Sequence, residues 1–203
     1  MLATMLSALL QVGIVLVIAG VVYFAMRRRG GPFLRFVGLQ PTSFLALAAG
    51  AAVGLVVVAA ILVTPGMSEL ASSEGTVAGD AIRNGSSAPL LLSLFVTAVF
   101  KTSLSEELLF RGVIGKRLIA WLGFQRGNFI QATLFGLVHL LLLLVPAASA
   151  VLVASMVLIT GISGWINGWL NERVGGGSIL PGWAAHAVAN VSAFLWLGAG
   201  ASG

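Results

Sequence analysis

The sequence predicts an all-α membrane protein, a polytopic bundle of about six main transmembrane helices. Apolar residues make up 59% of the 203-residue chain and charged residues only 8%, far below the roughly 25% charge of a soluble globular domain. The mean hydropathy is +1.07. The charge-free stretches are also long enough to cross a hydrocarbon core about 30 Å thick, which takes about 20 helical residues.

The predicted spans correspond to the runs without charged side chains. The run of residues 127–171 is about twice the length that one span needs and carries Pro146 near its middle. We therefore expect it to form two spans joined by a tight turn. Because the bilayer uses most of the chain, we expect residues 1–203 to form one membrane-embedded domain. The five runs are 1–26, 36–68, 84–100, 127–171 and 174–203.

The basic residues lie beside the spans and predict their orientation. The first run has no basic leader or small-residue cleavage site and ends in Arg27 to Arg29, which indicates a retained span rather than a removed signal. Basic loops stay in the cytoplasm, and only Arg83 of the eleven basic residues then falls outside. The expected arrangement has residues 27–35, 116–126 and 172–173 inside, and both termini, residues 64–87 and Pro146 outside.

Composition excludes several kinds of chemistry. The formal charge of +5 is explained by this topology, so no nucleic-acid partner is expected. The chain has no cysteine, which excludes disulfides, thiolate metal sites and a cysteine nucleophile. Two glycine pairs with GxxxG spacing, Gly50 with Gly54 and Gly164 with Gly168, predict close helix packing within one bundle.

The few ionisable residues inside the apolar runs are the candidate functional residues, because a charge in hydrocarbon is costly unless it is paired or lines a wet cavity. Residues four apart on a helix share a face, whereas adjacent residues point about 100° apart. Glu107 should therefore pair with Arg111, and Glu106 should be free to face a cavity. The three clusters are Glu106, Glu107 and Arg111; Phe135 and His139; and His186 and Asn190.

Each cluster alone has an ordinary structural explanation. An interfacial ion pair, a histidine bonded to a neighbouring helix and an asparagine between helices are all common in membrane bundles. A bundle that needed only such contacts would use Ser, Thr and small residues before two histidines and a carboxylate pair. We therefore expect Glu106, His139, His186 and Asn190 to converge on one cavity open toward the cytoplasmic half.

The three patterns Glu106-Glu107-x-x-x-Arg111, Phe135-x-x-x-His139 and His186-x-x-x-Asn190 resemble the signature motifs of the CPBP family, in the family's order and on separate helices. This family holds the CAAX prenyl endopeptidases and bacterial Abi-type proteins. The resemblance covers about residues 101–194. It implies an intramembrane endopeptidase near the cytosolic face of a prokaryotic plasma membrane, acting on a membrane-associated peptide or protein. It does not imply that this member's substrate is prenylated.

The residue types present suffice for peptide hydrolysis without a covalent intermediate. No serine lies in a Gly-x-Ser-x-Gly elbow, which disfavours nucleophilic catalysis. We hypothesise that Glu106 is the general base for a water molecule that His139 helps to hold. The resemblance implies that His186 and Asn190 then donate hydrogen bonds to the tetrahedral oxyanion.

A zinc-dependent variant of the same protease remains open. Glu106, His139 and His186 have the ligand types of catalytic zinc with a free position for water. However, the adjacent glutamates do not form a His-Glu-x-x-His motif, and Asn190 is a poor zinc ligand. We therefore expect no cofactor.

Two functions without catalysis also remain open. Relatives can act as scaffolds or as immunity and sorting factors, and a bundle with a polar cavity could be a small transporter. A transporter of this size would more often show repeated halves with broken helices, which the sequence lacks.

Overall fold

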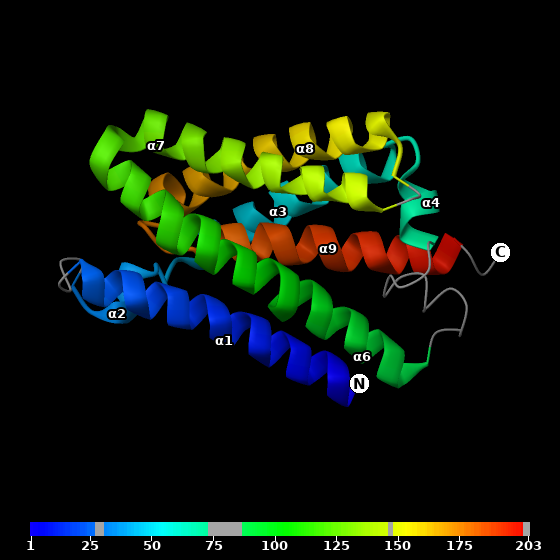
Figure 1. Cartoon of the computed structure of the whole chain (residues 1–203), viewed down its shortest axis with the longest axis horizontal. Helices are drawn as coiled ribbons and strands as arrows, with labels where there is room; N and C mark the ends of the chain where they lie inside the picture. The colour runs from blue at the N-terminus through cyan, green and yellow to red at the C-terminus, as the bar shows by residue number, and fades with distance from the viewer. Residues whose placement is uncertain (27–30, 73–86, 146–147, 201–203) are drawn as a thin grey trace.

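The computed structural model describes residues 1–26, 31–72, 87–145 and 148–200, and every regular element within those ranges is helical (Figure 1). The predicted all-α class is confirmed for this part of the chain. The elements in order are α1 (Leu2–Ala25), α2 (Phe33–Phe36), α3 (Phe44–Leu62), α4 (Met67–Ser72), α6 (Ala88–Val96), the π-helices η1 (Thr97–Leu104) and η2 (Glu107–Gly115), α7 (Lys116–Val138), the 3₁₀-helix η3 (His139–Leu144), α8 (Ala150–Trp169), the π-helix η4 (Leu170–Val174) and α9 (Leu180–Gly200).

Four helical stretches of the described residues are long and apolar enough to cross a membrane: Leu2–Ala25, Phe44–Leu62, Ala88–Leu144 and Ala150–Val174. The third stretch has 57 residues, well over twice the length of one span. The sequence predicted about six spans, and this count of four supports a multi-pass bundle without establishing six.

The third stretch is divided by a reversal inside α7. Gly123 has φ 77° and ψ 166°, a conformation outside the helical region that glycine adopts without steric cost. Figure 1 shows the chain turning back within α7, so that two arms diverge from the bend. Gly127 lets the arms close, because a β-carbon there would meet the backbone of Leu118 and Ile119. We call residues 88–122 the first arm and residues 124–144 the second arm.

One end of the bundle gathers basic side chains. The start of α1 and the end of α9 lie at the same end, and α2 and the bend of α7 lie at the other (Figure 1). At that other end, Lys116 Nζ lies 2.8 Å from Glu172 Oε1 and Arg117 donates to the Phe36 carbonyl at 2.8 Å. We call it the basic end. The parts of the predicted orientation that involve Arg27 to Arg29, Arg83 and Pro146 fall outside the described residues.

Sequence features explain where two of the spans begin. Ser43 and Ser149 precede α3 and α8, and their side chains accept hydrogen bonds from the backbone N–H groups of Ala46 and Leu152. Such caps satisfy amide groups that have no partner in the first turn of a helix.

The GxxxG glycines bring helices into close contact, as predicted. A β-carbon at Gly50 or Gly54 of α3 would meet carbonyl oxygens of the α9 backbone. At Gly164 or Gly168 of α8 it would meet atoms of α7. These contacts are within one chain, so the packing function expected for the two pairs is confirmed.

The first arm contains two π-helices that flank Ser105 and Glu106. A π-helix closes i→i+5 hydrogen bonds, is rare, and occurs frequently at functional sites. Its wider turn also reduces the angle between adjacent side chains below the roughly 100° of an α-helix.

Candidate active site

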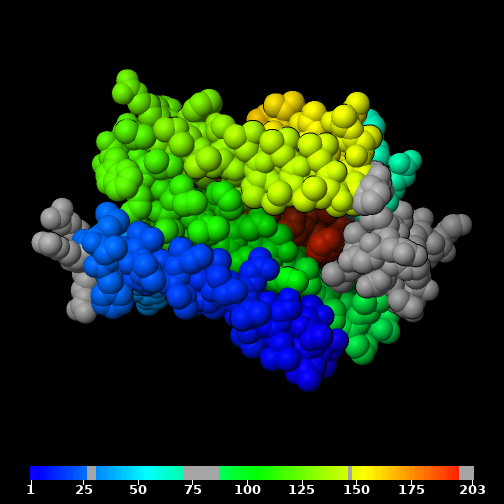
Figure 2. All heavy atoms as spheres, in the orientation of Figure 1, coloured from blue at the N-terminus to red at the C-terminus, as the bar shows by residue number. Residues whose placement is uncertain are grey.

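One cavity inside the bundle is lined by all four residues that the sequence suggested for catalysis, Glu106, His139, His186 and Asn190. Its volume is about 120 Å³, which is room for several water molecules. Glu106 comes from the first arm between η1 and η2, His139 from the start of η3, and His186 and Asn190 from α9. Figure 2 shows the surface hollowed between the two arms, with α9 at the bottom of the hollow.

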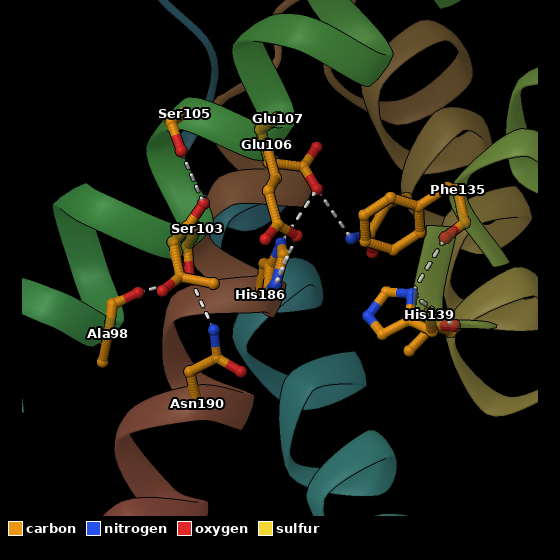
Figure 3. A network of polar contacts seen from close by, with 12 residues as sticks. Ala98, Ser103, Ser105, Glu106, Glu107, Phe135, His139, His186 and Asn190 are labelled. Carbon is orange, nitrogen blue, oxygen red and sulfur yellow. Dashed lines mark hydrogen bonds and ion pairs between the residues drawn. The ribbon is translucent and has the colours of Figure 1, made fainter. Parts of the chain in front are cut away.

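His186 lies between the two adjacent carboxylates (Figure 3). Its Nε2 atom is 3.7 Å from Glu106 Oε2 and its Nδ1 atom is 3.4 Å from Glu107 Oε1. Glu106 faces the cavity, as expected, yet both carboxylates approach the same imidazole. Two features allow this: the imidazole presents a nitrogen on each of two edges, and the π-helical turns narrow the angle between neighbouring residues.

The predicted pair between Glu107 and Arg111 is confirmed and is buried. Arg111 Nη1 lies 3.1 Å from Glu107 Oε1, and the exposed fractions of the two side chains are 2% and 0%. The guanidinium also lies over the Phe135 ring at 4.0 Å. Asn167 of α8 donates to the same Glu107 oxygen at 3.2 Å. Glu107 thus joins the first arm to α8 and, through His186, to α9.

His139 is held by one edge of its ring. Its Nδ1 atom is 2.9 Å from the Phe135 carbonyl oxygen and 3.2 Å from Thr160 Oγ1. The Thr160 hydroxyl donates to the Met156 carbonyl at 2.6 Å, so its oxygen accepts from His139. Both contacts favour the tautomer with the proton on Nδ1. The opposite edge of the ring is turned toward His186 (Figure 3).

Phe135 lies between the two histidines. Its ring centroid is 5.3 Å from that of His139 and 5.9 Å from that of His186, each at an interplanar angle of 79°. The predicted contact one turn before His139 is therefore edge-to-face, an arrangement that aromatic pairs favour. No hydrogen bond between the described residues joins His139 directly to Glu106.

Asn190 reaches the first arm from α9. Its Nδ2 atom donates to Ser103 Oγ at 3.2 Å, and Ser103 in turn donates to the Ala98 carbonyl at 2.6 Å (Figure 3). The amide of Asn190 has a second N–H donor, which remains for another acceptor in the cavity.

Three residues of this network were not identified from the sequence: Ser103, Thr160 and Asn167. An asparagine in a charge-free span is a signal, since polar side chains inside a membrane need partners, and Asn167 could have been found in that way. Ser103 and Thr160 could not, because hydroxyl side chains are ordinary contacts between membrane helices.

The residues named for the alternative zinc centre, Glu106, His139 and His186, all line this cavity. Within the described ranges, no group of three or more His, Asp or Glu side chains is placed so that it could hold a metal ion. These three side chains are not gathered as a ligand set.

Comparison with known families agrees with the motifs. The family model described as Rce1-like, type II CAAX prenyl endopeptidase Rce1-like, matches residues 88–192. This range is just over half of the chain and contains all three motifs. Neither the curated proteins nor the solved structures contain a significant match.

Proposed function

The chain belongs to the Rce1-like family of type II CAAX prenyl endopeptidases, and from this membership we propose that it is an intramembrane endopeptidase that cuts a membrane-associated peptide or protein. Its apolar helices and its family make it an integral membrane protein. The observation that supports the proposal most directly is the shared cavity of Glu106, His139, His186 and Asn190.

In the proposed mechanism Glu106 is the general base. It takes a proton from a water molecule held between its carboxylate and the free edge of His139, and the water oxygen bonds to the carbonyl carbon of the peptide. Glu106 is suited to this role because its side chain is 28% exposed, whereas Glu107 is fully buried against Arg111. Glu106 then gives the proton to the leaving amine as the carbon–nitrogen bond breaks.

The oxyanion of the tetrahedral intermediate would be stabilised from α9. As an imidazolium, with its Nδ1–H directed at the Glu107 carboxylate, His186 can also donate from Nε2, and Asn190 can donate the N–H that Ser103 does not take. Donors that are fixed before the reaction stabilise developing charge without reorganisation. The contacts of Glu107 and Ser103 supply that fixation.

We also propose six crossings with the basic end in the cytoplasm of a prokaryotic cell. The two arms then count as separate spans, and α9, with 21 residues, is about 30 Å long and can form the sixth. Glu106 precedes Lys116 of the basic end by ten residues, and the π-helix η2 lies between them. The site would then lie inside the membrane, reached from the cytoplasmic side.

The experiment is cleavage by the purified protein in liposomes. Internally quenched peptides with and without a prenylated cysteine near the C-terminus would show whether the substrate must be prenylated. Glu106→Gln should lower the rate by about 10²- to 10⁴-fold without lowering the unfolding temperature. Glu69→Gln, in α4, is the matched control and should cleave at the wild-type rate.

Three outcomes would overturn parts of this proposal. Cleavage by Glu106→Gln at the wild-type rate would remove Glu106 as the base. A rate that falls with a chelator and returns with zinc would replace the metal-free mechanism. Absence of cleavage for every peptide would favour a scaffold or immunity-type role.

A further inference from the structure

A second and much smaller cavity borders Arg111. We call it the polar-core cavity; its volume is about 10 Å³, and its polar lining residues are Arg111, Asn128, Gln131, Asn171 and Glu172. Among the described residues, none lines both this cavity and the cavity of the candidate active site. The polar-core cavity is therefore a separate space, and its volume is about that of one water-sized probe.

Four of these five polar residues are buried. Their exposed fractions are at most 3%, and they come from three elements, with Arg111 on η2, Asn128 and Gln131 on α7, and Asn171 on η4. Glu172, whose side chain is 24% exposed, lies at the basic end. The polar-core cavity thus lies where the two arms meet η4, between the buried guanidinium and the basic end.

Several polar atoms of the lining residues have no hydrogen-bond partner among the described residues. They are the donors Nε and Nη2 of Arg111 and Nδ2 of Asn171, and the acceptor Oε1 of Gln131, and all are buried. Buried donors and acceptors in folded proteins are nearly always paired, either with protein atoms or with ordered water. A ligand in this cavity would therefore meet both donors and an acceptor.

The orientation of the two amides is fixed by their other contacts. Gln131 Nε2 donates to Asn128 Oδ1 and to the Gly164 carbonyl, both at 2.9 Å. Asn171 Oδ1 accepts from the Gly182 N–H at 2.7 Å. Exchanging the nitrogen and oxygen of either amide would set acceptor against acceptor or donor against donor. The atoms that remain for a ligand are therefore the oxygen of Gln131 and the nitrogen of Asn171.

A water molecule suits this mixed set better than an ion. A cation would lie against the guanidinium of Arg111, and an anion would meet the Gln131 oxygen in a space that the Glu172 carboxylate also lines. A buried water typically makes about three hydrogen bonds. One water can accept from Arg111 and Asn171 and donate to Gln131, because water is both donor and acceptor.

Arg111 connects the polar-core cavity to the candidate active site. Its Nη1 atom lies 3.1 Å from Glu107 Oε1, and the same oxygen lies 3.4 Å from His186 Nδ1. The guanidinium is planar and its N–H groups form a rigid fork. A contact that holds Nε or Nη2 therefore also fixes where Nη1 meets Glu107, and with it the carboxylate that faces His186.

We propose that the polar-core cavity binds one water molecule, and that this water, held by Gln131 and Asn171, orients Arg111 toward Glu107. Gln131 and Asn171 are then positioning residues, which act on the reaction through Arg111, Glu107 and His186. The kinetic consequence rests on the proposed peptidase function. The water site itself rests only on the cavity and on the polar atoms around it.

The water can be observed in a high-resolution crystal structure of the purified protein. The wild type should show a density peak within about 3.2 Å of Gln131 Oε1 and of a nitrogen of Arg111 or Asn171. Gln131→Met should lose the peak and alter the separation of Arg111 Nη1 from Glu107 Oε1. Gln131→Glu loses the same Nε2 donor but keeps an acceptor oxygen, so it should keep the peak. A wild-type map that shows other buried waters and none here would overturn the proposal.

Peptide cleavage tests the positioning role. Gln131→Met should lower kcat by roughly fivefold, the effect of one neutral hydrogen bond, with KM unchanged, and Gln131→Glu should restore most of the rate. Gln40→Met is the matched control, because the Gln40 amide lies outside the cavity and donates to the Gly176 carbonyl. It should cleave at the wild-type rate.

Two further results would overturn the positioning role. One is an equal loss of kcat in Gln131→Met and Gln131→Glu, and the other is an unchanged separation of Arg111 from Glu107 in Gln131→Met. The density peak and this separation are measured without any cleavage. They therefore distinguish a failure of this inference from a failure of the proposed peptidase function.

Discussion

Glu107 Oε1 lies 3.4 Å from His186 Nδ1, and the same oxygen receives the guanidinium of Arg111 at 3.1 Å. This carboxylate is fully buried, while its neighbour Glu106 is partly exposed to the cavity. Two adjacent residues of one type thus have different surroundings. Glu107 orients its neighbours, and Glu106 is accessible to water and substrate.

Replacing Glu107 with Gln should lower the stability of the protein as well as its rate of peptide cleavage. The change leaves the Arg111 charge buried without its counter-charge, and removing one partner of a buried pair costs about 3–5 kcal/mol. Thermal unfolding of the purified protein in detergent, followed by tryptophan fluorescence, measures the effect. The double variant Glu107→Leu/Arg111→Met should recover part of the loss, because neither charge then remains. An unfolding temperature equal to that of the wild type for Glu107→Gln would contradict the assigned role.

Gly112→Ala should destabilise the junction between η2 and the segment that follows α2. A β-carbon at Gly112 would lie 2.6 Å from the Val37 carbonyl oxygen, and such overpacking typically costs about 1–3 kcal/mol. Gly13→Ala is the matched control, since a β-carbon there meets no atom within 4 Å. The two unfolding temperatures should differ, with only Gly112→Ala below the wild type. Equal temperatures would mean that Val37 can move aside.

Thr160→Val should slow cleavage moderately by releasing His139. The hydroxyl accepts from His139 Nδ1 at 3.2 Å, and one neutral hydrogen bond contributes about 1 kcal/mol, or roughly fivefold in kcat. Thr133→Val is the control, because the Thr133 hydroxyl donates to the Phe129 carbonyl on its own helix. Steady-state kinetics should show the loss in kcat for Thr160→Val alone. A loss as large as that of His139→Ala would show a role beyond positioning.

The proposed membrane orientation can be tested by labelling single introduced cysteines, because the chain has no cysteine of its own. Cysteines at Arg35 and Arg126, both exposed, should react with an impermeant thiol reagent from the cytoplasmic side. A cysteine at Ser87, just before α6, should react from the other side. The positive-inside rule is the physical basis. Labelling of Ser87 and Arg126 from the same side would reject the topology.

The fold class could be predicted because hydropathy alone determines that the chain must be helical in a bilayer. The number of spans is harder to predict from the sequence, since the two arms form one continuous helical stretch of 57 residues. Their reversal depends on the backbone conformation of Gly123. A single glycine among basic residues gives little sign of such a bend.

The candidate site was predictable in its residue types and only partly in its contacts. Four-residue spacing identified the pair of Glu107 with Arg111, because that geometry is local to one helix. The position of His186 between two carboxylates depends on how α9 packs against a π-helical arm. Neither the packing nor the π-helical turns follow from residue spacing.

The reversal at Gly123 also bears on how the protein enters the membrane. The first arm carries Lys101, Glu106, Glu107 and Arg111 within eleven residues, and each charge opposes the transfer of an isolated helix into lipid. The second arm follows after one non-helical residue and contains no charge beyond Arg126. We expect the insertion machinery to release the two arms together as a helical hairpin, with the apolar arm carrying the charged one into the bilayer.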